Sequence, residues 1–384
     1  MNGERPKSIW HVVALIATLG LAAVVAVVAV SRSDRPQAEG APTSSPSPSP
    51  TASPTGPGSL AGTGPYLVYA VESGEVFAYD IGAKDWITMG RIDDAPVPQH
   101  LRQPGSGDIV AFATDAGTVW RVDREGLQRV AILPVTSGQQ LEGGTVSRDG
   151  RRFAVAWTGT DPELYVVNLG NGRSSVQPRE SGSGNRYPDE PLVPVGWSLG
   201  GSLIYQMPVC DCDDGSPGLY LYDLEAQRSS LLSATSGSDF FDRFAISPDG
   251  QELVWSDIED RPYTLRRLAA GRQSATILRR DDDERIPWVV WASDGRALML
   301  VGSDPSTREV SYELAEPESG DPTRALRGVP ADAIPLALMP GRILVILTGP
   351  TVPTDDRSLQ LVVDGRVTVV TEPGQGPVFL GWLR

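Results

Sequence analysis

The residues with the greatest capacity for chemistry lie in one short segment, Cys210-Asp211-Cys212-Asp213-Asp214. Thiolates and carboxylates are both metal ligands. A calcium loop requires the pattern Asp-x-Asp-x-Asp/Asn-Gly, and here the third acidic residue comes one position early. A zinc site needs four ligands, whereas this segment offers two cysteines with no histidine close in sequence. We therefore assign no metal, and Asp211, Asp213 and Asp214 remain weak candidate ligands.

Cys210 and Cys212 are the only cysteines of the chain, so no disulfide framework holds the fold together. Outside the cytoplasm these two thiols would form a small, strained disulfide, which would be redox-labile. The alternative is a solvated loop without a chemical role. Both interpretations, a redox pair and a solvated loop, stay open.

The sequence shows no constellation typical of catalysis. His100 is the only histidine after residue 64, so a Ser-His-Asp triad would depend on it alone, and no Gly-x-Ser-x-Gly elbow is present. We interpret His100 as a surface turn residue. No glycine-rich phosphate loop or haem motif occurs, and we expect no cofactor. A pair of carboxylates distant in sequence would be invisible in the sequence alone, which leaves glycosidase chemistry open.

Three other features are more readily explained by structure than by function. The acidic run Asp281–Glu284 fits a solvated loop. The segment Thr114–Trp120 resembles the Asp-box of sialidase propellers, but it occurs once and lacks the leading serine, which favours a plain strand turn. Trp197, Trp291 and Trp382 recur at equivalent positions, where packing between repeats is favoured over a sugar-binding platform.

Charge excludes one class of partner. The chain has 48 acidic residues against 33 Lys and Arg, a formal net charge of -15. Such a surface repels phosphates, so we expect no nucleic-acid partner, and contact with anionic lipid headgroups is also disfavoured.

An apolar segment near the N-terminus predicts a membrane anchor. Residues 9–30 contain no Asp, Glu, Lys or Arg. At about 1.5 Å rise per residue a helix of this length spans the ~30 Å hydrocarbon core. A cleaved signal peptide is the alternative, but its apolar stretch would be shorter. We predict a short cytoplasmic tail over 1–8, a single transmembrane helix over 9–30 and an extracytoplasmic C-terminal part, because long domains translocate largely regardless of flanking charge.

Residues 31–64 are rich in Pro, Ser and Thr and contain almost no apolar side chain. Such a segment cannot bury enough surface to offset its ordering entropy, so the sequence predicts a disordered linker between membrane and domain.

Residues 65–384 carry a repeat of roughly 46 residues, marked by a tight turn after an apolar strand. The clearest copies of the turn are Val146–Gly150, Gly196–Gly200, Ile246–Gly250 and Trp291–Gly295, with weaker copies at 101–105 and 338–341. Each turn leads into further β-rich runs. Four strands per repeat of this length are typical of β-propeller blades.

The two ends of the repeat region complete each other. The segment from Tyr66 has the pattern of the second strand of a blade, and Val378–Trp382 that of a first strand with no blade after it. Pairing of the two would close the ring and remove exposed sheet edges. First strands near 101, 146, 196, 246, 291, 338 and 381 predict an all-β propeller of seven four-stranded blades, with six or eight as alternatives.

The turn Ile246–Gly250 followed by Leu253–Trp255, with its copies, resembles the TolB-like and WD40-like propeller repeats of bacterial envelope proteins. The resemblance covers nearly all of 65–384 and implies the fold. It implies little about function, because propellers have binding, scaffolding and enzymatic roles.

From these features we expect a membrane-anchored, extracytoplasmic propeller that acts as a non-enzymatic binding or scaffold module in the cell envelope, with an envelope protein or glycan as partner. A carboxylate-based glycosidase or other hydrolase on the same fold is the first alternative. An envelope sensor is the second, although a tail of eight residues (1–8) is too short for a folded output domain.

Overall fold

The computed structural model divides the chain into two compact units, Met1–Pro50 and Thr51–Arg384. It describes residues 58–93, 105–136, 138–158, 163–176, 193–207, 218–234, 244–257, 263–269, 275–280, 285–303, 310–349, 357–371 and 375–384, all in the second unit. The predicted tail and transmembrane segment, and all of the predicted linker up to residue 57, lie outside these ranges. Within them, no helix is long and apolar enough to cross a membrane.

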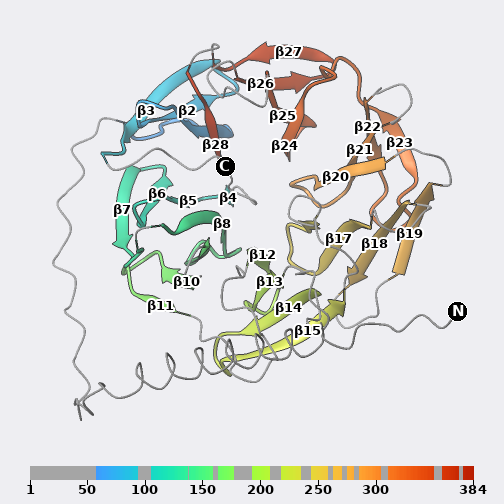
Figure 1. Cartoon of the computed structure of the whole chain (residues 1–384). Helices are drawn as coiled ribbons and strands as arrows, with labels where there is room; N and C mark the ends of the chain where they lie inside the picture. Colours follow the sequence, from blue (N-terminus) through green and yellow to red (C-terminus); the bar gives the residue numbers. More distant parts are fainter. Residues whose placement is uncertain are drawn as a thin grey trace, which may run out of the picture. The chain divides into compact units, whose positions relative to one another are not determined.

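The described residues form seven sheets, antiparallel except for one parallel pair of strands, arranged round a common axis, which confirms the predicted seven-bladed β-propeller (Figure 1). Blade 1 contains β28 (Val378–Leu383), β1 (Tyr66–Ala70), β2 (Glu75–Asp80) and β3 (Asp85–Arg91). Blade 2 contains β4 (Gly105–Gly107), β5 (Val110–Ala113), β6 (Thr118–Asp123) and β7 (Gly126–Ile132), and blade 3 contains β8 (Gln140–Val146), β9 (Arg152–Thr158), β10 (Glu163–Asn168) and β11 (Ser174–Val176).

The other four blades follow the same order from the inner to the outer strand. Blade 4 contains β12 (Val193–Trp197), β13 (Leu203–Met207), β14 (Gly218–Asp223) and β15 (Arg228–Ala234). Blade 5 contains β16 (Phe244–Ile246), β17 (Glu252–Asp257), β18 (Tyr263–Ala269) and β19 (Ala275–Arg280). Blade 6 contains β20 (Arg285–Trp291), β21 (Leu298–Ser303), β22 (Val310–Ala315) and β23 (Pro322–Ala325), and blade 7 contains β24 (Ile334–Met339), β25 (Ile343–Thr348), β26 (Ser358–Val363) and β27 (Arg366–Val369).

Burial explains why the second strand of a blade consists of one apolar run. Each blade is packed between two neighbours, so both faces of its central strands are covered. All five residues of β1 are buried, and so are Phe153–Trp157 in β9. The outermost strands β11 and β23 are exposed throughout. The core is therefore a ring of clusters between blades.

The ring closes as the sequence predicts. β28 pairs antiparallel with β1, with Leu67 opposite Trp382, so the last strand supplies the inner strand of the first blade. Leu380 is fully buried between blades 1 and 2. Leu60, which precedes β1, is buried in the same cluster, and its N–H donates to the carbonyl of Arg124 at 2.9 Å.

The inner strand of blade 2 departs from the expected pattern. β4 pairs in parallel with β28 of blade 1, with Gly381 opposite Gly105, and the sheet of blade 2 itself contains β5, β6 and β7. Blades 1 and 2 are consequently joined by backbone hydrogen bonds at the inner edge.

Because neighbouring strands are antiparallel, the turn after the first strand and the turn after the third strand of each blade lie at the same end. We call this end of the propeller the turn face. The repeated sequence turns all belong to it, so residues about 46 positions apart in sequence meet there.

Candidate functional site

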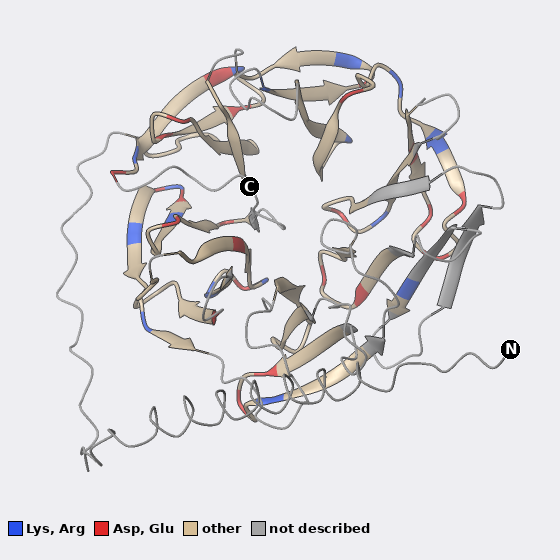
Figure 2. Ribbon diagram, in the orientation of Figure 1, with Lys and Arg blue, Asp and Glu red and all other residues tan. Residues whose placement is uncertain are grey.

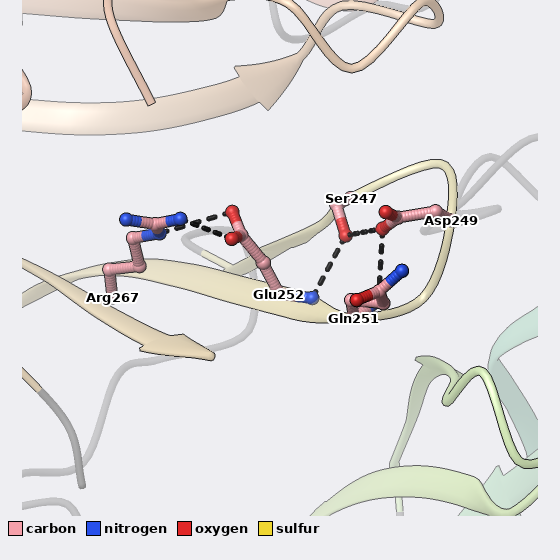
Figure 3. A network of polar contacts seen from close by, with 5 residues as sticks. All are labelled: Ser247, Asp249, Gln251, Glu252 and Arg267. Atoms are coloured by element: carbon pink, nitrogen blue, oxygen red, sulfur yellow. Dashed lines mark hydrogen bonds and ion pairs between the residues drawn. The ribbon is translucent and has the colours of Figure 1, made fainter. Parts of the chain in front are cut away.

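A serine and an aspartate organise the repeated turn in the same way in blades 3 and 5. Ser247 donates its hydroxyl hydrogen to Asp249 Oδ1 at 2.6 Å and accepts the backbone N–H of Glu252 at 2.9 Å. Asp249 Oδ1 also accepts the N–H of Gln251 at 3.0 Å (Figure 3). Ser147 and Asp149 repeat the 2.6 Å contact in blade 3. The turns are thus rigid platforms that hold one carboxylate each.

Hydrogen bonding keeps these two carboxylates ionised. Partial burial by itself would raise the pKa of Asp149, but the hydroxyl of Ser147, the N–H of Arg151 and nearby arginine charges outweigh it, and the pKa is lowered. The balance is the same for Asp249, where Ser247, the backbone and the charge of Arg148 lower the pKa against the effect of burial.

Contacts between turns tie neighbouring blades together. The N–H of Leu199 in blade 4 donates to the carbonyl of Gly250 in blade 5 at 3.0 Å, and the backbone N–H of Ser293 in blade 6 donates to the carbonyl of Leu338 in blade 7 at 2.9 Å. Arg148 reaches from blade 3 past blade 4 and donates to the carbonyl of Asp249 at 3.2 Å. The turns of blades 3, 4 and 5 are therefore cross-linked to one another, and blade 6 is linked to blade 7.

These turns surround a cavity of about 1090 Å³, which we call the channel mouth. All seven blades contribute to its lining, from Gly107 of blade 2 to Trp382 of blade 1. Its acidic lining residues are Asp108, Asp149, Asp249, Glu252, Asp294, Glu316 and Glu318, and its basic ones are Arg148, Arg267, Arg296 and Arg384. Figure 2 shows acidic positions, in red, in every part of the ring, as expected for a chain of net charge -15.

One ion pair is built into the lining. Arg267 of β18 donates through Nε to Glu252 Oε2 at 3.0 Å, and its Nη2 binds Glu252 Oε1 (Figure 3). Their side chains are 20% and 21% exposed, so the pair is half-sheltered and has a fixed, two-point geometry. The charge of Arg267 is thereby neutralised locally.

The three recurring tryptophans are part of the wall between blades. Trp197 and Trp291 are buried, and each indole N–H donates to a carbonyl of the preceding blade, Thr145 at 3.2 Å and Ala245 at 3.0 Å. Trp382 is buried between blades 7 and 1. Packing, the favoured interpretation from the sequence, is confirmed by this burial and by the two hydrogen bonds, and the edges of all three residues also line the channel mouth.

The other predicted candidates are placed only in part. Thr114–Gly117 forms the tight turn between β5 and β6, with the N–H of Gly117 donating to Thr114 at 2.8 Å, in agreement with a plain strand turn. The segment Cys210–Asp214, His100 and the run Asp281–Glu284 lie outside the described residues. Among the residues that are described, no three His, Cys, Asp or Glu side chains could together hold a metal ion.

Comparison with known proteins supports the fold and goes no further. No protein-family model matches the sequence, and no curated protein is recognisably similar to it. Among solved structures, oligogalacturonate lyase from Vibrio parahaemolyticus is 14% identical, with 80% of this chain and 86% of that chain covered and a TM-score of 0.55.

An oligogalacturonate lyase in complex with manganese gives 12% identity, coverage of 77% and 81%, and a TM-score of 0.51. TolB from Acinetobacter baumannii gives 16% identity, coverage of 83% and 82%, and a TM-score of 0.47. At such identities the likeness shows the fold alone. The strand pairing itself establishes the seven-bladed propeller that the resemblance to TolB-like repeats predicted.

Proposed function

We propose that this chain is a membrane-anchored, extracytoplasmic propeller that binds an envelope partner at the channel mouth without catalysing a reaction. The observation that carries the proposal is the channel mouth itself, a preformed cavity of about 1090 Å³ to which every blade contributes. Small-ligand sites are typically concave and preformed, with volumes of roughly 300–1,000 Å³, so this cavity is slightly larger than that range. The hydrogen-bonded turns hold its shape without a ligand, which lowers the entropy cost of binding.

The electrostatics of the turn carboxylates favour binding over acid catalysis. A glycosidase needs one carboxylic acid that stays protonated, with a raised pKa, beside an ionised partner. In Asp149 and Asp249 the pKa is lowered, the opposite of what a general acid requires. Both side chains are suited to act as fixed negative charges.

A lyase role like that of the oligogalacturonate lyases has less support. Oligogalacturonate is a polyanion, and the channel mouth has seven carboxylates against four guanidinium groups. Charge repulsion would oppose the entry of such a substrate. The likeness in fold alone does not offset this argument.

The placement in the envelope rests on residues 9–30, which form an uncharged apolar segment long enough to span a bilayer. The test is protease treatment of intact cells that produce the full chain with a C-terminal epitope. Loss of the epitope without cell lysis, with the N-terminal tail protected, is the expected result. An epitope that is cut only after lysis contradicts an extracytoplasmic propeller.

The binding role is tested by capture of partners from native membranes with the full chain after mild cross-linking. We expect a reproducible partner whose recovery falls at least severalfold when Asp249 and Asp294, on neighbouring turns of the channel mouth, are both changed to Arg. Glu125 and Glu225 lie in turns of the same face outside the cavity, and changing both to Arg is the matched control. Equal recovery of the partner by the parent protein, the channel-mouth variant and the control variant would contradict the proposed binding site.

A further inference from the structure

The negative charge of the channel mouth is concentrated on one side. Blades 5 and 6 supply five of its seven carboxylates but two of its four arginines, an excess of three. Blades 1, 2 and 3 supply the other two carboxylates and two arginines, but the guanidinium of one of these, Arg148, reaches the carbonyl of Asp249 and offsets one charge of the blade 5 excess. The blade 5 contributions are Asp249, Glu252 and Arg267, and those of blade 6 are Asp294, Glu316, Glu318 and Arg296.

The ion pair within blade 5 leaves this excess unchanged, because it removes one negative and one positive charge together. Arg267 is held by two contacts to Glu252 within blade 5, so neither group contributes a free charge. The carboxylate of Asp249 uses Oδ1 for Ser247 and for the backbone of its own turn, which fixes its position. Glu316 and Glu318 are exposed at the turn between β22 and β23.

The same wall contains an unsatisfied polar group. Ser293 of blade 6 lines the cavity, and its Oγ is buried with no hydrogen-bond partner. Among the described residues, four other side-chain atoms are also buried without a hydrogen-bond partner, but none of them belongs to a residue that lines the channel mouth. Buried polar atoms in native proteins are nearly always paired, so the Ser293 hydroxyl retains an unused hydrogen-bonding capacity beside the cavity.

Size restricts the form of the ligand. A cavity of about 1090 Å³ admits several side chains or a short extended segment, and excludes a folded domain. Lysine and arginine have stems long enough to place a charge inside such a cavity while their backbone stays at its rim.

From these observations we propose that the partner presents an extended segment bearing lysine or arginine, and that these side chains bind the blade 5 and blade 6 side of the channel mouth. This inference rests on the proposed binding function and names the chemistry of its partner. A polyanionic glycan is the opposing outcome of the test.

The experiment uses the full chain in nanodiscs of zwitterionic lipid, which do not attract charged peptides by themselves. The probe is a fluorescein-labelled peptide of alternating glycine and arginine, compared with its glutamate counterpart and with unlabelled trigalacturonate as competitor. We expect the arginine peptide alone to raise the fluorescence anisotropy. Its affinity should fall about tenfold when Glu316→Gln and Glu318→Gln are combined, since two charge contacts of up to about 1 kcal/mol each are lost.

The control combines Glu125→Gln with Glu225→Gln, which removes the same charge from turns of the same face outside the cavity. We expect this control variant to change the affinity for the arginine peptide by less than twofold. Equal losses in the two double variants would mean that the general field of an acidic protein holds the peptide, and would overturn the inference, as would preferential binding of the glutamate peptide or of trigalacturonate. If the mouth variants lose a captured partner while the arginine peptide does not bind, this inference fails and the proposed function stands.

Discussion

The indole N–H of Trp197 donates a 3.2 Å hydrogen bond to the carbonyl of Thr145 in the preceding blade. Trp291 makes the corresponding 3.0 Å bond to Ala245 further round the ring. These bonds join inner strands of different sheets, where no backbone ladder is shared. They are therefore a specific element of blade-to-blade cohesion beyond apolar packing.

Replacing Trp197 or Trp291 by Phe should lower the free energy of unfolding by about 1–3 kcal/mol, because a buried carbonyl loses its donor and a small cavity opens. Urea unfolding followed by circular dichroism measures the change. Trp86→Phe is the comparison, since Trp86 also donates to another blade, at Val370, but is 49% exposed. A cost for Trp86→Phe equal to that of the buried pair would contradict the role of burial.

A second prediction concerns the glycine of the repeated turn. Gly250 has φ +70°, and an added Cβ would lie 2.8 Å from the carbonyl oxygen of Trp197 and 2.9 Å from the nitrogen of Leu199. Gly201, in the turn of blade 4, has φ +80° with open space around it. Gly201→Ala should cost about 1 kcal/mol of stability from backbone strain alone.

Gly250→Ala should cost about 3 kcal/mol or more, because it adds a clash with backbone that belongs to the neighbouring blade. Thermal unfolding of the two variants side by side is the measurement. Similar melting temperatures for the pair would show that the turns of blades 4 and 5 do not approach as closely as these distances require.

The third prediction tests ring closure. Leu380→Ala removes a fully buried side chain from the strand that closes the ring, and should lower stability by about 3 kcal/mol. Leu231→Ala is the same change on the outer strand of blade 4, at 50% exposure, and should cost less than about 1 kcal/mol. Equal costs measured by urea unfolding would mean that β28 is not part of the cooperative core.

The fourth prediction concerns acid sensitivity. The folded-state pKa values of Asp149 and Asp249 are lowered, so their contribution to stability is complete above the unfolded-state pKa near 3.9 and is lost as pH falls through the folded-state values. At pH 6 the double variant Asp149→Asn with Asp249→Asn should have a lower free energy of unfolding than the parent protein. Between pH 5 and pH 3 its free energy of unfolding should fall by a smaller amount than that of the parent, because it lacks these two carboxylates. Parallel curves for the two proteins would contradict the linkage.

Much of the fold follows from local pattern. The Ser-Pro-Asp-Gly turn and its copies mark the end of each inner strand, and the strand-like run at Val378–Trp382 finds its partner in Tyr66–Ala70. The parallel pairing of β4 with β28 has no such signal, because Gly105-Ser106-Gly107 carries no alternation of apolar side chains. β4 pairs with β28 because closure of the ring places the two strands next to each other.

The channel mouth could not be predicted for a related reason. Asp249 and Asp294 look like ordinary turn residues in the sequence, where each is explained by its own local hydrogen bonds. The excess of negative charge on the blade 5 and blade 6 side of the cavity depends on the order of the blades round the axis. By contrast, the residues that seemed most reactive in the sequence, Cys210 and Cys212, lie outside the described residues and keep the status of a prediction.

The shared first blade has a consequence for biosynthesis. β3 ends at Arg91, but the inner strand of its sheet begins at Val378, so nearly 300 residues must be made in between. At synthesis rates of roughly 5–20 residues per second, this interval is on the order of half a minute. Throughout it, the open edge of β1 has no native neighbour. The nascent chain is therefore committed to late folding of its first blade, and it depends on protection of that edge until β28 has been made.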